Sequence, residues 1–196
     1  MEQEKLPADI LRDIAKRENW DFKLYEKTIN IKYGHHIRRV IIKNSAFKNA
    51  YFISDKSANY DRYRIYSGVF FPIEGHDHFH LLIRQRNIID KLRFRINKLR
   101  FKTGNSSFDS DVYVQTNNEI ETHKLLSSGK IQIDIMDFLS SADLLYIAIN
   151  EINPEFTDEL KGRQYLSVFM SLSWMLDKSM IDTAFKLGEK LKQRLN

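Results

Sequence analysis

The sequence predicts a single α+β domain built on an antiparallel sheet of about six or seven strands. Residues 20–86 place apolar side chains at every second position, in short segments separated by glycine or asparagine. The segments before and after them repeat apolar residues at helical spacings, which is typical of amphipathic helices. Short connections between strands favour antiparallel pairing, because parallel pairing needs a long crossover. A length of 196 residues suits one domain, so residues 1–196 are treated as one unit.

The composition is that of a folded globular protein, and it restricts the available chemistry. Hydrophobic residues make up 42% of the chain and charged residues 29%, and both fractions are ordinary. The absence of cysteine excludes disulfides, thiolate nucleophiles, iron–sulfur clusters and thiolate zinc sites. The net charge of +5 is mild evidence for an acidic partner. With no signal-peptide core and no apolar stretch long enough to cross a bilayer, the sequence predicts a soluble, cytoplasmic protein.

The first predicted element is an amphipathic helix of about three turns that begins near Pro7 and ends near Asn19. Proline suits the first position of a helix, and Asp9 in the first turn complements the helix dipole. Its apolar face consists of Leu6, Ile10, Leu11 and Ile14.

A series of strands follows, recognised by the alternation of apolar and polar residues. The predicted strands lie around residues 22–24, 29–33, 40–42, 51–53, 63–71 and 79–83. The breaks between them are supplied by Gly34, Asn44, Asn59 and Gly75. Residues 87–102 fit both a strand and a helical stripe. We expect a helix to about Asn97 and then a strand through Leu99 and Phe101.

The centre of the chain predicts a strand–helix–helix–strand unit. Residues 108–126 read as a short strand that runs into a capped helix, in which Thr116 and Glu119 form a capping-box pattern. A second helix is expected over residues 131–139. Residues 144–149 have the length and composition of a buried strand.

The last segment, residues 164–195, predicts C-terminal helices. Its apolar positions recur mostly every three, four or seven residues, which indicates two consecutive helices or one helix bent near Lys178. Ser179 is a suitable N-cap for the second part.

The basic run, residues 84–102, is a candidate surface for nucleic acid or another polyanion. It carries basic residues at nearly every second position against a single acid, Asp90. The candidate contacts are Arg84, Arg86, Arg93, Arg95, Lys98 and Arg100. The alternative is a solvated face balanced by the acids of residues 109–111 and 119–121.

Residues 74–80 contain a histidine cluster, formed by His76, His78 and His80. In a strand these imidazoles would share one face, where they could bind zinc, iron or nickel. The alternative is a polar hairpin loop, and no second ligand motif such as HExxH occurs in the chain. We therefore expect no metal and no other cofactor. Phosphate-loop, dinucleotide and serine-hydrolase motifs are also absent, which favours a protein without enzymatic activity.

A recurring spacing marks the middle of the chain. The shared positions are Phe108, Val112, Val114, Asn118, Thr122 and Leu126, preceded by Tyr66, Gly68, Phe70 and Phe71 and followed by Tyr146 and Phe156. Over residues 60–160 this pattern resembles a bacterial family catalogued as domain of unknown function thirty-one thirty-seven, which is often mislabelled galanin. Members typically carry transmembrane helices before this domain. This chain has the predicted N-terminal helix there instead, so membrane attachment is not carried over.

The resemblance implies a bacterial protein and structural roles, but no known chemistry. Those roles would fall on Gly68, Phe108, Val114, Asn118, Leu126 and Tyr146. The chain departs from the pattern at Val112, Asn118 and Thr122, which replace an aromatic residue, an acid and an alanine. These positions suit packing or capping, so the departures concern the alignment rather than an activity.

The sequence as a whole favours a non-enzymatic domain that binds a protein or a small ligand. The first alternative is polyanion binding through the basic run, and the second is a metal-dependent enzyme built on the histidine cluster. Ligand, partner and oligomeric state are left open.

Overall fold

One antiparallel sheet dominates the computed structural model, which describes residues 6–30, 35–47, 49–59, 62–87 and 100–195. Within these ranges the sheet has nine strands in the order β1-β2-β3-β4-β9-β8-β5-β7-β6. The strands are β1 (Asp21–Asn30), β2 (His35–Lys43), β3 (Tyr51–Asn59), β4 (Arg62–Ile73), β5 (Leu81–Gln85), β6 (Arg100–Phe101), β7 (Val112–Thr116), β8 (Leu145–Ile149) and β9 (Gln164–Ser171). The α+β class is confirmed, but the expected six or seven strands were too few.

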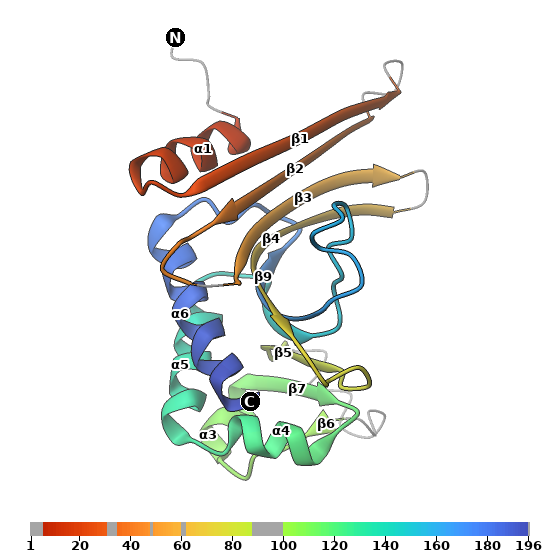
Figure 1. Ribbon diagram of the computed structural model, residues 1–196. Helices are drawn as coiled ribbons and strands as arrows, with labels where there is room; N and C mark the ends of the chain where they lie inside the picture. The colour runs from red at the N-terminus through yellow and green to blue at the C-terminus, as the bar shows by residue number, and fades with distance from the viewer. Residues whose placement is uncertain (1–5, 31–34, 48, 60–61, 88–99, 196) are drawn as a thin grey trace.

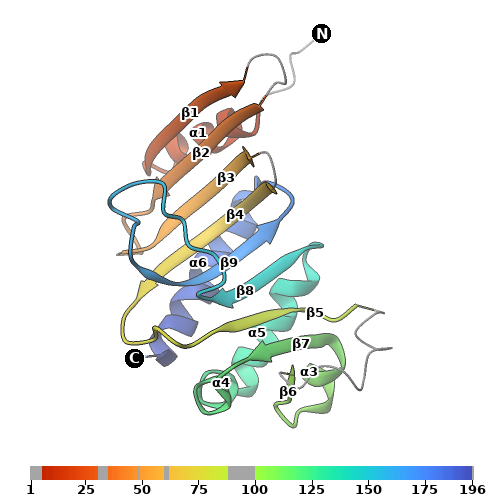
Figure 2. The same cartoon turned by 90° about the vertical axis from the view of Figure 1, so that its right-hand side faces the viewer.

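The helices pack on one face of this sheet, as Figures 1 and 2 show from two directions. They are α1 (Pro7–Arg17), α3 (Ser106–Asp111), α4 (Glu119–Leu126), α5 (Gly129–Ser140) and α6 (Lys178–Leu195). The opposite face is crossed by residues 150–163, which connect β8 to β9 and which we call the strap. No helix in the described part of the chain is long and apolar enough to cross a membrane.

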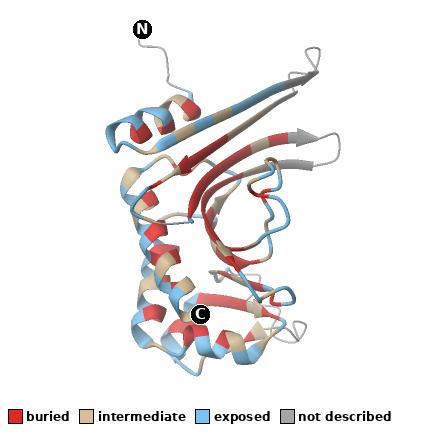
Figure 3. Ribbon diagram, in the orientation of Figure 1, coloured by how far each residue is buried: buried red, intermediate tan, exposed pale blue. Residues whose placement is uncertain are grey.

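The alternation of side chains along the strands gives the sheet two hydrophobic cores. The larger core lies under the helices and contains residues such as Phe52, Phe71 and Phe185. The smaller core lies under the strap, where Phe70, Leu160 and Tyr165 are fully or almost fully buried. Figure 3 shows buried residues concentrated in the central strands between these two layers.

The C-terminal segment corrects one prediction. Residues 164–171 form the central strand β9 rather than a helix, and the single helix α6 begins at Lys178. Asp177, not Ser179, caps α6 by accepting a hydrogen bond from the backbone N–H of Met180 at 2.9 Å. A strand covered on both faces loses its polar alternation, so the apolar run of β9 resembles a helical stripe.

The predicted strand–helix–helix–strand unit is present as β7, α4, α5 and β8, with two local differences. Phe108 lies in the short helix α3, and the strand begins only at Val112. The N-cap of α4 is Asn118, whose side chain accepts from the N–H of Glu121, so the capping box expected at Thr116 is wrong. The hydroxyl of Thr116 instead lies 3.0 Å from the N–H of Asn118.

The described residues of the family-like pattern occupy packing and capping positions. Phe108, Val114 and Leu126 are buried in the larger core, and Tyr146 stacks on Phe169 at a ring separation of 5.3 Å. Gly68 lies where β4 and β9 approach closely. A Cβ atom there would lie 2.3 Å from the carbonyl oxygen of Val168.

Candidate ligand-binding cleft

The structure describes only part of the basic run. Arg93, Arg95 and Lys98 lie outside the described residues, whereas Arg84 is on β5 and Arg100 on β6, with Arg86 just after β5. The guanidinium of Arg84 lies 4.4 Å from the ring centre of Tyr113, and that of Arg100 donates to the carbonyl of Asp109 at 3.0 Å. The described arginines thus contact their own fold. Polyanion binding through this run stays a prediction.

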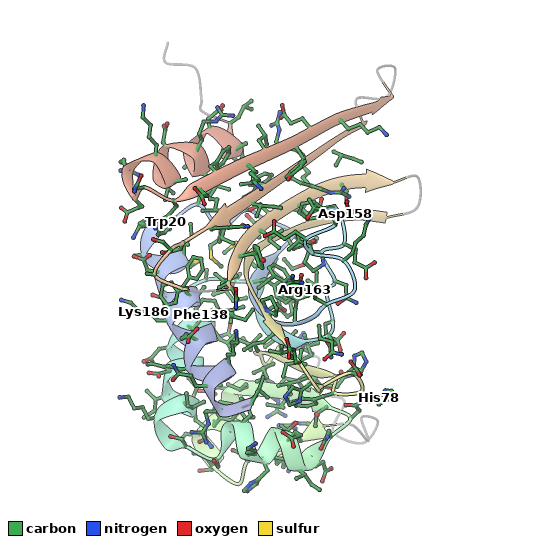
Figure 4. All side chains as sticks on the ribbon, viewed as in Figure 1. Trp20, His78, Phe138, Asp158, Arg163 and Lys186 are labelled. Carbon is green, nitrogen blue, oxygen red and sulfur yellow. The ribbon has the colours of Figure 1, made fainter. Side chains whose placement is uncertain are left out.

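The histidine cluster lies in the turn between β4 and β5, not in a strand. His76, His78 and His80 therefore do not follow the alternation that would place them on one face. His80 faces Glu151 at 3.6 Å, and His78 is exposed at the end of the turn labelled in Figure 4. Within the described ranges no three His, Asp or Glu side chains gather closely enough to hold a metal ion.

A polar cleft of about 520 Å³ opens at the end of the β2–β3 hairpin. It is built from the segment between α1 and β1, the end of β2, the β2–β3 turn, the start of β3 and the strap. The polar side chains that line it are Asn19, Asp21, Lys43, Asn44, Ser45, Asn49, Tyr51 and Glu159, and Phe47 and Ala50 add apolar atoms. Its volume is within the range of small-molecule sites.

Three of these side chains form a charged cluster. A carboxylate oxygen of Glu159, Oε1, accepts from the ammonium of Lys43 and from the hydroxyl of Tyr51, the latter at 3.2 Å. The hydrogen bond between Lys43 and Glu159 is the main cause that raises the pKa of Lys43 and lowers that of Glu159. Burial, followed by the charge of Glu159, raises the pKa of Tyr51. The cluster therefore holds a full ammonium and a full carboxylate at neutral pH.

Asn44 places a hydrogen-bond donor at this cleft. The residue as a whole is 7% exposed, and its Oδ1 atom accepts from the N–H of Ala46 at 2.9 Å. This bond fixes which side of the amide is oxygen, since only oxygen can accept. The Nδ2 group has no hydrogen-bond partner among the described residues and is not one of their fully buried unpartnered atoms, so its donors are accessible.

The strap positions Glu159 because it is fastened at several points. At its start Asn150 donates to the carbonyls of His76 and Phe79 and accepts from the N–H of Tyr165. Further along, the ring of Phe156 lies 4.8 Å from the guanidinium of Arg39. Figure 4 shows two other strap residues, Asp158 and Arg163, on the sheet face opposite the helices.

A larger groove of about 660 Å³ lies between α5 and α6. Its buried lining residues, Phe138 and Leu187, are apolar members of the main core. The charged residues at its rim include the ion pair between Lys190 and Asp134. The cleft at Asn44 is the stronger candidate, because it combines a largely buried asparagine, whose Nδ2 donor has no partner among the described residues, with the Lys43–Glu159 pair.

The chain has no counterpart in the comparisons with known proteins: no protein-family model, no curated protein and no solved structure matches it. The resemblance over residues 60–160 therefore stays a prediction. The cleft itself was not predicted from the sequence. From the sequence Asn44 was recognised as a break between strands, but not as a lining residue of a cleft.

Proposed function

We propose that this protein binds a small polar molecule in the cleft and does not transform it. The proposal depends on one observation above all. Asn44 is almost fully buried, its acceptor is committed to Ala46, and it lines a cavity that also holds the Lys43–Glu159 pair. The Nδ2 atom is not among the fully buried unpartnered atoms of the described residues, so it is accessible and a ligand oxygen could accept a hydrogen bond from it.

The electrostatics of the cleft support binding over catalysis. An efficient general acid or base has a pKa close to the working pH. The pKa of Lys43 is raised and that of Glu159 is lowered, so both move away from neutrality. Paired groups of this kind suit the orientation of a ligand rather than proton transfer.

The test is a screen of small metabolites against the full chain by thermal shift, followed by calorimetric titration of each stabilising compound. The decisive variant is Asn44→Asp, which keeps the acceptor for the Ala46 N–H and removes the donor to the ligand. We expect at least about a tenfold loss of affinity, since one hydrogen bond is worth roughly 1 kcal/mol and the new charge adds to its loss.

Asn153→Asp is the matched control, because it makes the same chemical change at an exposed asparagine of the strap. It should bind like the wild type. The proposal is wrong if no compound stabilises the protein. It is also wrong if the two aspartate variants lose affinity equally.

A further inference from the structure

The charges that line the cleft disfavour strongly charged ligands. Among the lining side chains that the structure describes, Asp21 and Glu159 are acidic and Lys43 is basic. The ammonium of Lys43 is already neutralised by Glu159. The charge of Lys23 also acts on Glu159, and that of Arg163 acts on Tyr51. Acidic and basic groups are thus mixed around the cleft, so a strongly charged ligand of either sign would meet like charges as well as opposite ones.

The cleft offers both hydrogen-bond donors and hydrogen-bond acceptors. Asn44 offers the donors of Nδ2, and Lys43 retains N–H donors beyond the one it gives to Glu159. Glu159 uses Oε1 for Lys43 and Tyr51, which leaves Oε2 without a partner among the described residues. A donor and a strong acceptor thus lie on neighbouring groups of one ion pair.

Hydroxyl groups match this arrangement because each of them both donates and accepts. Two adjacent hydroxyls could bridge the pair, one donating to Oε2 of Glu159 and the other accepting from Lys43. A third group could accept from Asn44. Phe47, half-buried and stacked on Phe185 at 4.9 Å, supplies apolar atoms for the C–H surface of such a ligand.

We infer that the ligand of the cleft is an uncharged polyhydroxylated molecule, of the class of neutral mono- and disaccharides. This inference rests on the proposed function and specifies its ligand. It assigns Asn44 as the anchoring donor and the Lys43–Glu159 pair as the group that recognises two neighbouring hydroxyls.

The full chain is titrated with matched sets of sugars, and binding is measured by calorimetry or saturation-transfer NMR. Glucose, galactose and mannose are each compared with their own uronic acid, 6-phosphate and 2-amino sugar. Maltose and lactose represent neutral disaccharides. Spermidine and citrate represent charged ligands of other shapes. We expect a neutral sugar to bind, and its uronate and phosphate to bind at least about tenfold more weakly.

Variants then locate the site. Glu159→Gln keeps the shape of the side chain, removes one carboxylate and frees Lys43. This variant should bind the neutral sugar about tenfold more weakly, because hydrogen bonds to charged groups are stronger than those to neutral groups. It should also discriminate less against the uronate. Lys190→Gln breaks a separate ion pair, between α5 and α6. It should change neither the affinity for the neutral sugar nor the discrimination against the uronate.

The outcomes separate the inference from the proposed function. The inference is wrong if spermidine, citrate or a sugar phosphate binds in preference to every neutral sugar. The proposed binding function still stands in that case, provided that Asn44→Asp abolishes the binding of that charged ligand. If a neutral sugar binds equally well to wild type and to Glu159→Gln, the assigned recognition is wrong. If no member of any set binds, both the inference and the function lose their support.

Discussion

Lys43 and Glu159 form an ion pair across the cleft although 116 positions separate them in the sequence. Lys43 ends a strand of the sheet, whereas Glu159 lies in the strap that crosses the face opposite the helices. The pair therefore links the rigid hairpin of β2 and β3 to a connection without regular structure. Tyr51 completes the link from the first position of β3.

Removing this pair should loosen the strap without unfolding the protein. Both side chains are about one-third exposed, at 35% and 34%, and such pairs contribute about 1 kcal/mol or less. In Glu159→Gln we expect a change in the free energy of unfolding below about 1 kcal/mol, but trypsin cleavage after Lys161 and Arg163 several times faster. Limited proteolysis with mass spectrometry measures the rate. Unchanged cleavage, or equal acceleration in Lys190→Gln, would show that the pair does not hold the strap.

The buried carboxyl of Asp55 should make stability depend on pH. Asp55 is 6% exposed on β3, and its burial raises its pKa above the ordinary value although Arg39 lies 3.1 Å away. The folded state therefore binds the proton more tightly than the unfolded state. The Asp55 contribution to stability is greatest below the ordinary aspartate pKa of about 3.9 and is lost as the pH rises through the raised folded value.

Asp55→Asn replaces the titrating carboxyl group with an amide that does not titrate. The stability of this variant relative to the wild type should therefore rise over that same pH window and then level off. Urea unfolding of both proteins between about pH 3.5 and 7 measures the difference. Asp158→Asn is the control with the opposite sign. The hydrogen bond from Lys161 lowers the pKa of Asp158, so that contribution is lost as the pH falls. A constant difference between wild type and Asp55→Asn would contradict the assignment.

Gly68 is required by the close approach of two central strands. A methyl group there would lie 2.3 Å from the carbonyl oxygen of Val168 and 2.4 Å from the Cα of Phe169, and neither backbone atom can move alone. Gly68→Ala should destabilise the protein by about 3 kcal/mol or more, or prevent folding. Gly129→Ala is at the first position of α5, where the new methyl group would meet no atom within 4 Å apart from its chain neighbours and its own helix backbone. It should stabilise the protein by a few tenths of a kcal/mol. Chemical denaturation compares them. Similar values would refute the steric argument.

These residues show why the sequence predicted some parts of the structure and not others. The strands from β1 to β5 could be recognised because many of their side chains alternate between core and solvent. Strand β9 could not, since both of its faces are buried and its apolar residues run together. The cap of α4 was placed two residues early because Thr116 and Asn118 are both capping residues, and tertiary packing decides which one serves.

The cleft could not be predicted because its groups meet only in the folded chain. Nothing in the local sequence of Glu159 indicates that the strap returns to Lys43. Asn44 resembles any asparagine at the end of a strand, and its value as a donor depends on burial and on the bond to Ala46. The lack of cysteine could be read from the composition, but a cleft lined by amides and one ion pair has no sequence motif.

Asn150 should be the main anchor of the strap. Its backbone adopts a left-handed conformation at φ 57°, which asparagine tolerates better than most residues. Its Nδ2 group donates to the carbonyls of His76 and Phe79 at 2.9 and 3.0 Å. Asn150→Asp keeps the backbone preference but turns an oxygen towards these two carbonyls. We expect a loss of about 2–3 kcal/mol, from two hydrogen bonds and the new repulsion. Urea unfolding measures it, with Asn153→Asp as the exposed control. A loss below about 0.5 kcal/mol would mean that the strap is held elsewhere, by Phe156 and Leu160 in the smaller core.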